Sequence, residues 1–250
     1  MGMKPSILLL TLLIGLAANP AGAADIIKPF SSMASLDDGW SALDFPNIDR
    51  HTDYALITED ETQVIQADTD NSASGRIARI SIEPGEKLLM RWRWKVSTVY
   101  DKGDARQKSG DDYPARIYVA FGFQPEKAGF FERAKRKAVE ILYGNELPGN
   151  AINYIWANRL PLGAMVPNPY TEKTRMIAVT SGSEKVGQWV TVERDLVSDY
   201  RTAFGEPPPR IIGIGIMSDS DNTGEAATAW YGDIELIRVS EAEGEAEDES

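Results

Sequence analysis

The sequence predicts a mainly β protein, an antiparallel two-sheet β-sandwich of the jelly-roll type. Strand-like alternation is clearest at 87–96 (KLLMRWRWKV) and at 115–123 (ARIYVAFGF). Apolar side chains recur there at every second position, which is the period of a strand with one buried face. Further runs of this kind are separated by turn residues, without the strand-helix alternation of a parallel α/β fold. We expect one such domain over residues 24–239.

The remaining elements follow from the same patterning. Two short runs, 54–57 and 62–67, flank an acidic turn and are typical of a hairpin. Further strands are expected at 76–82, 151–156, 176–180, 188–196, 210–217 and 227–237, with a short helix at 199–204. Residues 126–143 instead place Phe131, Ala134 and Ala138 along one stripe, which predicts a single inserted amphipathic helix.

The first 23 residues have the three parts of a secretory signal peptide. Lys4 precedes an apolar run at 7–18, and Ala21-Gly22-Ala23 is typical of a cleavage site. We therefore expect a periplasmic or secreted protein. The apolar run is too short for a membrane span of about 20 residues, and no later segment is long and apolar enough to be one. The chain has no cysteine, which excludes a disulfide framework.

The charge of the chain is strongly negative. Lysine and arginine number 26 and the acids 38, which gives a net charge of -12. Six of the acids lie within 241–250, so residues 240–250 are expected to be a disordered acidic tail. The rest of the chain is still acidic. A nucleic-acid partner is therefore not expected, because phosphate contacts need a basic surface.

A ligand-binding face is predicted on the strand faces opposite the apolar residues. Its members are Arg91, Arg93 and Lys95 on the first strand, Arg116 and Tyr118 on the second, and Asp111 and Asp112 in the loop before the second. If both strands belong to one sheet, the charged faces coincide, and like charges this close need acidic partners or a bound anion. Arginine suits a carboxylate-bearing glycan or another small anionic ligand. Internal salt bridges are the alternative.

A loop near the end of the chain gathers oxygen-bearing side chains. The sequence SDSDNTG contains Asp219, Asp221, Asn222 and Thr223, and Ca²⁺ prefers oxygen ligands of this kind. The loop is not an EF-hand, because Trp230 or Tyr231 stands where a bidentate glutamate is required. A calcium site and a structural turn rich in Asp and Asn both fit the pattern.

Several blocks of the sequence resemble a known family. In order they are GDDYPARIYVAFGF, AINYIWAN, GQWVTVERDL with DYRTAFG, and IGIMSDSDNTG with AWYGDIEL. Together they are similar to a family of exported bacterial proteins catalogued as domain of unknown function 3047, over roughly 40–237. That resemblance implies no known activity. The strand order and the closing YGDIEL also look like jelly-roll carbohydrate-binding modules, at the level of the fold alone.

Three functions are compatible with these features. The first is an exported binding module for carbohydrate that uses the charged face. The second is a glycan-cleaving enzyme, with an aspartate pair as acid and base on the same scaffold. The third is a structural envelope protein whose polar face is internally salt-bridged. His51 is the only histidine, which argues against a multi-histidine metal site. The sequence does not predict the oligomeric state.

Overall fold

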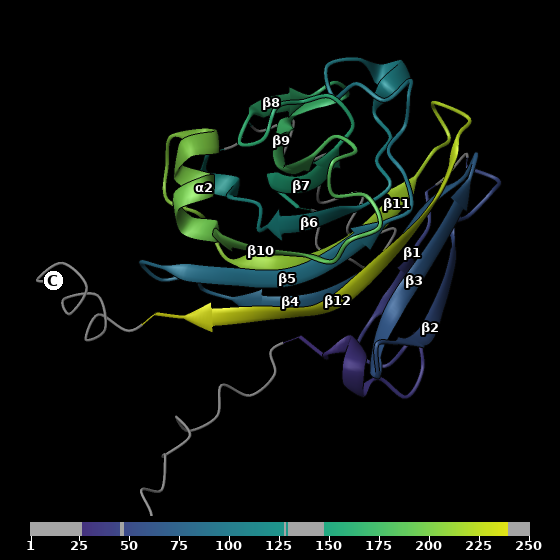
Figure 1. Ribbon diagram of the computed structural model, residues 1–250. Coiled ribbons are helices and arrows are strands. Elements are labelled where there is room, and N and C mark those ends of the chain that lie inside the picture. Colours follow the sequence, from purple (N-terminus) through teal and green to yellow (C-terminus); the bar gives the residue numbers. More distant parts are fainter. Residues whose placement is uncertain (1–26, 46–47, 128, 130–147, 240–250) are drawn as a thin grey trace, which may run out of the picture.

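A computed structural model describes residues 27–45, 48–127, 129 and 148–239, and two sheets face each other in it (Figure 1). The first sheet has seven strands in the order β1 (Ser41–Leu43), β4 (Ala73–Ile82), β11 (Ile211–Asp219), β6 (Arg116–Phe121), β7 (Ala151–Ala157), β9 (Thr171–Ser181) and β8 (Met165–Asn168). The second has five, in the order β10 (Val190–Asp195), β5 (Leu88–Val96), β12 (Ala226–Arg238), β3 (Thr62–Asp70) and β2 (Asp53–Glu59). The predicted two-sheet sandwich is therefore confirmed.

The helices are few and short in the described part of the chain. They are the 3-10 helices η1 (Phe30–Ser32), η2 (Lys108–Gly110) and η3 (Pro125–Lys127), and the α-helix α2 (Leu196–Phe204). The predicted helix at 126–143 lies outside the described residues apart from η3, as do the predicted leader and the acidic tail. No helix in the described ranges has the length and apolar character of a membrane span.

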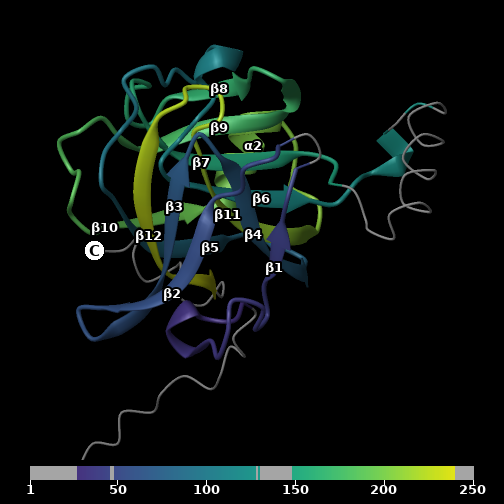
Figure 2. The same cartoon turned by 90° about the vertical axis from the view of Figure 1, so that its right-hand side faces the viewer.

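The strands pair antiparallel with one exception, the parallel pair β7 and β9. After β7 the chain runs to the sheet edge as β8 and turns back, so that β9 lies between β7 and β8 (Figure 2). β8 runs opposite to β7, and β9 runs opposite to β8, so after two reversals β9 has the direction of β7. Among the described residues the sandwich is therefore antiparallel except where β9 pairs with β7.

The strands at 87–96 and 115–123 were expected to belong to one sheet, but they belong to two different sheets. β5 belongs to the five-stranded sheet and β6 to the seven-stranded sheet. Their apolar faces meet across the core, so Arg93 and Arg116 point to opposite sides of the molecule. The prediction of a single charged face is wrong. Alternation along a strand shows which residues share a face, but it does not show which sheet the strand joins.

Large aromatic rings fill the space between the sheets. Trp92 and Trp94 of β5 are buried with their ring centroids 5.5 Å apart. Trp92 packs on Tyr154 at 5.4 Å, and Trp94 on Trp156 at 6.0 Å. The indole N–H of Trp94 donates to the Thr180 hydroxyl at 3.1 Å, so the ring is buried without an unpaired polar atom. Both tryptophans lie on the face of 87–96 that the alternation predicted to be buried.

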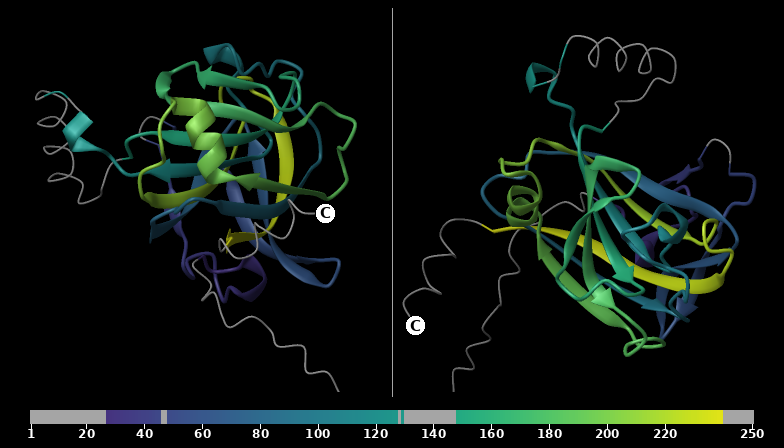
Figure 3. Two further views of the ribbon diagram at one scale, coloured as in Figure 1. Left: turned by 90° about the vertical axis from the view of Figure 1, so that its left-hand side faces the viewer. Right: turned by 90° about the horizontal axis from the view of Figure 1, so that it is seen from above.

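Helix α2 packs against β5 and β10 at one end of the sandwich (Figure 3). It begins where the Asp195 carboxylate accepts hydrogen bonds from the backbone of Val197 and Ser198. It ends at Gly205, whose φ of +75° is the left-handed conformation usual after a helix. The helix was predicted at 199–204, and in the structure it begins three residues earlier. Leu196 hid this start, because it continues the apolar pattern of the preceding strand.

Replacing Trp94 should destabilise the fold strongly. Trp94→Ala removes a fully buried ring and leaves the Thr180 hydroxyl unpaired, so the free energy of unfolding should fall by about 3–5 kcal/mol. Urea unfolding measures this. The exposed control Lys185→Ala should change that free energy by about 0.5 kcal/mol or less. Equal stabilities for the two variants would contradict the packing described here.

Candidate functional site

Two loops bring the predicted acids together at one end of the sandwich. The first, 97–115, leads into β6, and the second, 220–225, joins β11 to β12. Their backbones are tied by a hydrogen bond of 3.2 Å, which the N–H of Asp219 donates to the carbonyl oxygen of Tyr113. The backbone N–H of Tyr113 also donates to the Asp219 carboxylate at 3.2 Å. Asp112 therefore lies beside the loop that was predicted to bind a cation.

Three carboxylates converge there. One oxygen from each of Asp112, Asp219 and Asp221 lies within 4.8 Å of the other two. Asp112 and Asp219 are 0% and 1% exposed, whereas Asp221 is half-buried. A cation between them would be bound by the buried carboxylates of Asp112 and Asp219 and by the more accessible carboxylate of Asp221. We call these three residues the acidic cluster.

The other two predicted cation ligands of the loop, Asn222 and Thr223, donate hydrogen bonds to a carboxylate of the acidic cluster. The Asn222 side chain donates to one oxygen of Asp112 at 2.9 Å, and the Thr223 backbone N–H donates to the other at 2.6 Å. Both residues therefore hold a cluster carboxylate in position. Sequence reasoning placed Asp112 among the glycan-binding residues, because nothing in the sequence shows that its loop folds onto the loop of Asp219.

The electrostatics of the acidic cluster disfavour its negative charge. Burial raises the pKa of Asp219 well above the ordinary value. Burial and then the charge of Asp112 raise the pKa of Asp221. A raised carboxyl pKa means that ionisation costs more in the folded state than in the unfolded chain, so this contribution destabilises the fold as pH rises through the shifted range. A bound cation would offset that cost.

Arg116 provides a positive charge beside the acidic cluster. It is 4% exposed and donates to Asp219. Its guanidinium lies 5.3 Å from the ring centroids of both Tyr113 and Tyr118. Arg116 was expected on an open ligand-binding face, but it is a buried ion-pair partner. Asp111 is also buried here and accepts from Tyr113 at 3.1 Å.

Two more tyrosines, Tyr100 and Tyr170, approach the acidic cluster, and sequence reasoning missed Tyr100. Tyr100 is 1% exposed, and its hydroxyl has no hydrogen-bond partner within the described ranges. Burial raises its pKa, as do the nearby charges of Asp219 and Asp112. Tyr170 lies at the rim, and burial and then the charge of Asp111 raise its pKa. No periodic pattern marks either residue, because both lie in loops.

The basic residues of β5 lie on the outer face of the five-stranded sheet, and two of them are neutralised. Arg91 lies opposite Glu193 and Glu235 on the neighbouring strands, with ion-pair distances of 2.6 and 4.0 Å. Lys95 pairs with Glu59 and lies between two indoles, 5.3 Å from the Trp189 centroid and 4.3 Å from that of Trp230. Burial lowers the pKa of Lys95.

Arg93 differs from its two neighbours. Its guanidinium stacks on Trp189 at 4.5 Å, and no carboxylate of the described residues pairs with it. Its cross-strand neighbour on β10 is Thr191. On β12 it lies over Gly232, where a Cβ atom would come within 2.6 Å of the arginine side chain. Arg93 lines a depression of about 380 Å³ together with Thr62, Arg91, Trp92, Thr191, Asp233 and Glu235.

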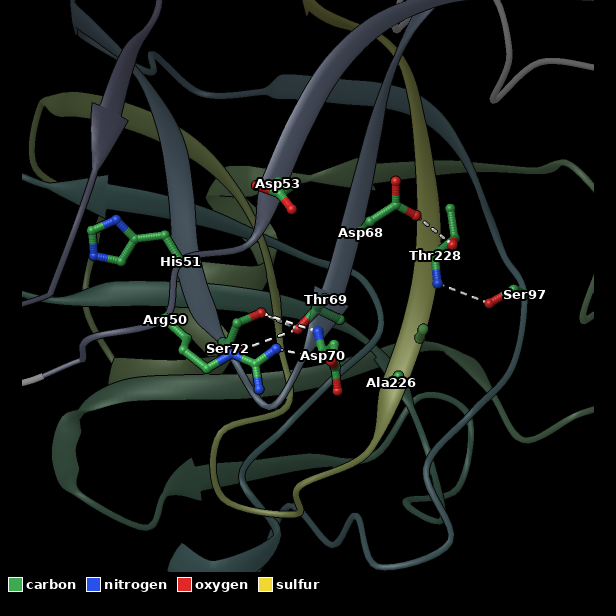
Figure 4. Close-up of a pocket in the computed structure, with 11 residues that line it drawn as sticks. Arg50, His51, Asp53, Asp68, Thr69, Asp70, Ser72, Ser97, Ala226 and Thr228 are labelled. Atoms are coloured by element: carbon green, nitrogen blue, oxygen red, sulfur yellow. Dashed lines mark hydrogen bonds and ion pairs between the residues drawn. The ribbon is translucent and has the colours of Figure 1, made fainter.

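A second depression, of about 410 Å³, opens where β2 begins and β3 ends (Figure 4). At its side Arg50 pairs with Asp70 at 2.8 Å. Thr228 donates its hydroxyl hydrogen to Asp68 at 2.5 Å, and His51 lies at the opposite wall. None of the residues predicted to bind a ligand lines this depression.

A family comparison identifies the relatives of the chain. The family described as protein of unknown function (DUF3047) matches residues 38–235. The chain belongs to the DUF3047 family. The resemblance found in the sequence is thereby confirmed. A comparison of this DUF3047 chain with curated proteins found no match.

Several solved structures are similar to the DUF3047 chain in fold. The carbohydrate recognition domain of Emp47p is 11% identical with a TM-score of 0.45, over 87% of this chain and 97% of that one. TmCBM61, solved with β-1,4-galactotriose, is 8% identical with a TM-score of 0.34, over 85% and 99%. Tailspike protein 4 of bacteriophage CBA120 is 11% identical with a TM-score of 0.37, over 86% of this chain and 21% of that one. This chain thus spans about a fifth of the tailspike domain, and no functional conclusion follows from similarities this distant.

Removing Arg116 should destabilise the fold strongly, as expected for a buried ion-pair partner and not for a surface residue. Arg116→Ala leaves the Asp219 carboxylate buried without its counter-charge, which typically costs about 3–5 kcal/mol. Urea unfolding should show this loss. Arg91→Ala is the matched control on an exposed strand face, and it should cost about 1 kcal/mol or less. If both variants lost equally little stability, Arg116 would not be a buried ion-pair partner.

Proposed function

We propose that this chain is an exported binding module for carbohydrate, that it binds acidic glycans in the Arg93 depression, and that its acidic cluster holds Ca²⁺. The leader at residues 1–23 supports export to the periplasm or beyond. The observation that carries glycan binding is Arg93. It is a stacked arginine that lines a depression of about 380 Å³ and has no acidic partner among the described residues.

The chemistry of the depression suits a sugar acid. Arginine presents paired N–H donors that match both oxygens of a carboxylate. Stacking on Trp189 fixes the plane of the guanidinium before a ligand arrives, which lowers the ordering cost of binding. Thr191 and Glu235 line the same depression and supply donors and acceptors for ring hydroxyls. Its volume lies within the range of small-molecule sites.

The enzyme alternative has less support from the geometry. Glycosidases place their two carboxyl groups about 5–10 Å apart across an open cleft. In the acidic cluster Asp112 and Asp219 are buried, and the oxygens lie within 4.8 Å of one another. This arrangement favours ion binding over acid-base chemistry. The internal ion pairs of Arg91 and Lys95 favour the structural alternative, so Arg93 is the residue that distinguishes it from a binder.

Calcium is the cation that best fits the acidic cluster. Ca²⁺ takes six to eight oxygen ligands in flexible geometry, and Asp112, Asp219 and Asp221 provide three carboxylates. The chain has no cysteine and one histidine, so softer metals would lack their preferred ligands. The buried phenol oxygen of Tyr100 is a further neutral acceptor near two of the carboxylates.

Truncating Arg93 should abolish the recognition of acidic glycans. We expect Arg93→Ala to lower the affinity for polygalacturonate or alginate at least tenfold in calorimetric titration, because the paired donors are lost. Arg93→Lys keeps the charge but loses the fork, so it should recover only part of the affinity. Arg79→Ala, on the other sheet, is the control and should bind as the unchanged protein does. If the unchanged protein bound neither polymer, the proposal would fall.

Calcium should raise the melting temperature of the protein. A ligand that binds only the folded state at one hundred times its Kd adds about 2.7 kcal/mol of stability. Thermal unfolding in CaCl₂ and in EDTA measures this. Asp221→Asn removes an accessible ligand charge and should abolish the difference, whereas Asp53→Asn, an exposed acid elsewhere, should retain it. Coincident curves for the unchanged protein would rule out a calcium site.

A further inference from the structure

Tyr170 is an exposed aromatic side chain at the rim of the acidic cluster. Within the described ranges only it and Leu162 are large apolar residues with high exposure, at 56% and 70%. The Tyr170 hydroxyl lies 2.9 Å from the side-chain oxygen of Asn222, the residue that follows Asp221. An exposed ring fixed beside a polar site differs from an apolar residue scattered on the surface.

The surroundings of Tyr170 hold it in one orientation. Its backbone N–H donates to Asn168 at 3.0 Å, and Asn168 donates in turn to Asp111 at 2.9 Å. Its hydroxyl also lies 3.2 Å from the carbonyl oxygen of Lys108 in η2. The loop with η2, strand β8 and the turn from β11 to β12 gather at the same end of the sandwich (Figures 1 and 2). Tyr170 is thus tied to both loops of the acidic cluster.

The acidic cluster has features of a ligand site beyond its charge. The Tyr100 hydroxyl is buried, lacks a partner among the described residues, and lies near the charges of Asp219 and Asp112. A buried polar atom without a partner indicates a missing ligand, ion or water. Asp221 is the half-buried member, and it adjoins the residue that contacts Tyr170. The accessible side of a bound cation would therefore face the Tyr170 ring.

We propose that the cation of the acidic cluster and the Tyr170 ring together form a calcium-dependent site for neutral sugars, separate from the Arg93 depression. The three carboxylates leave a six- to eight-coordinate Ca²⁺ with open positions. Two adjacent sugar hydroxyls supply such ligands, while the C–H face of the sugar packs on the aromatic ring. This inference rests on the calcium proposed above.

The charge of the site selects the class of sugar. Asp111 lies beside the acidic cluster, so four carboxylates lie together, with Arg116 as their buried counter-ion and Lys108 over the Tyr170 ring at 5.2 Å. With one Ca²⁺ the charges of these groups nearly cancel, so the site lacks the surplus positive charge that would favour an acidic glycan. The Arg93 depression on the other sheet has the opposite preference. Neutral and acidic sugars would thus be bound at different places on one chain.

Affinity electrophoresis through gels that contain galactomannan tests the site. This neutral polymer carries adjacent hydroxyl pairs of both relative orientations. We expect the unchanged protein to be retarded in CaCl₂ but not in EDTA. Tyr170→Ala should weaken the interaction at least tenfold while its melting temperature still rises with calcium. Tyr170→Phe keeps the stacking ring and should be retarded, and Leu162→Ala should behave as the unchanged protein does.

The outcomes separate this site from the proposed function. If calcium stabilises the protein but no retardation occurs in galactomannan, starch or mixed-linkage β-glucan, the sugar site is wrong and the calcium site stands. Retardation that persists in EDTA, or that Tyr170→Ala leaves unchanged, also overturns the site. Arg93→Ala should leave retardation by galactomannan intact. A loss of retardation in that variant would place neutral sugars in the Arg93 depression.

Discussion

The buried ion pair between Arg116 and Asp219 is the interaction on which the loop end of the sandwich depends. It joins β6 to β11 where water does not reach, so each charge needs the other. The single positive charge of Arg116 does not balance the negative charges of the other acids nearby. Asp112 is instead held by donors from Asn222 and Thr223, which fixes the loop that follows β11. The acids therefore order these loops, and the loops in turn place the acids within reach of a cation.

The sequence was a good guide to which residues are buried and a poor one to how strands assemble. β5 and β6 were predicted because strict alternation has no other common explanation. Their membership of different sheets depends on pairing between distant segments, which alternation does not encode. The short edge strand β8 escaped notice, since it has four residues and contains Pro167, which weakens any strand pattern. The insertion of β9 beside β7 is likewise a property of the whole sheet.

The sequence indicated which residues of the candidate site could bind a ligand, but it did not show which of them lie together in the fold. The oxygen-rich loop was recognised, and two of its aspartates belong to the acidic cluster. Asn222 and Thr223 were expected to be cation ligands, but hydrogen bonds turn them toward Asp112, whose loop lies more than one hundred positions earlier. Tyr100 was missed, because a tyrosine in a loop has no pattern that separates a packed ring from a ligand contact.

The contrast among the basic residues of β5 follows from register. Arg91 has a glutamate opposite it on each neighbouring strand, so its charge is offset within the sheet. One pair further along, the ladder between β5 and β12 shifts between Tyr231 and Ile234, and Gly232 lies beneath Arg93 where a side chain would otherwise stand. Bulges of this kind redirect side chains and are frequent beside binding sites. The same irregularity leaves Arg93 without an acidic partner among the described residues and gives its side chain room to lie flat on Trp189. Register therefore explains why Arg93, and not Arg91 or Lys95, is the residue of β5 that we propose to bind an external carboxylate.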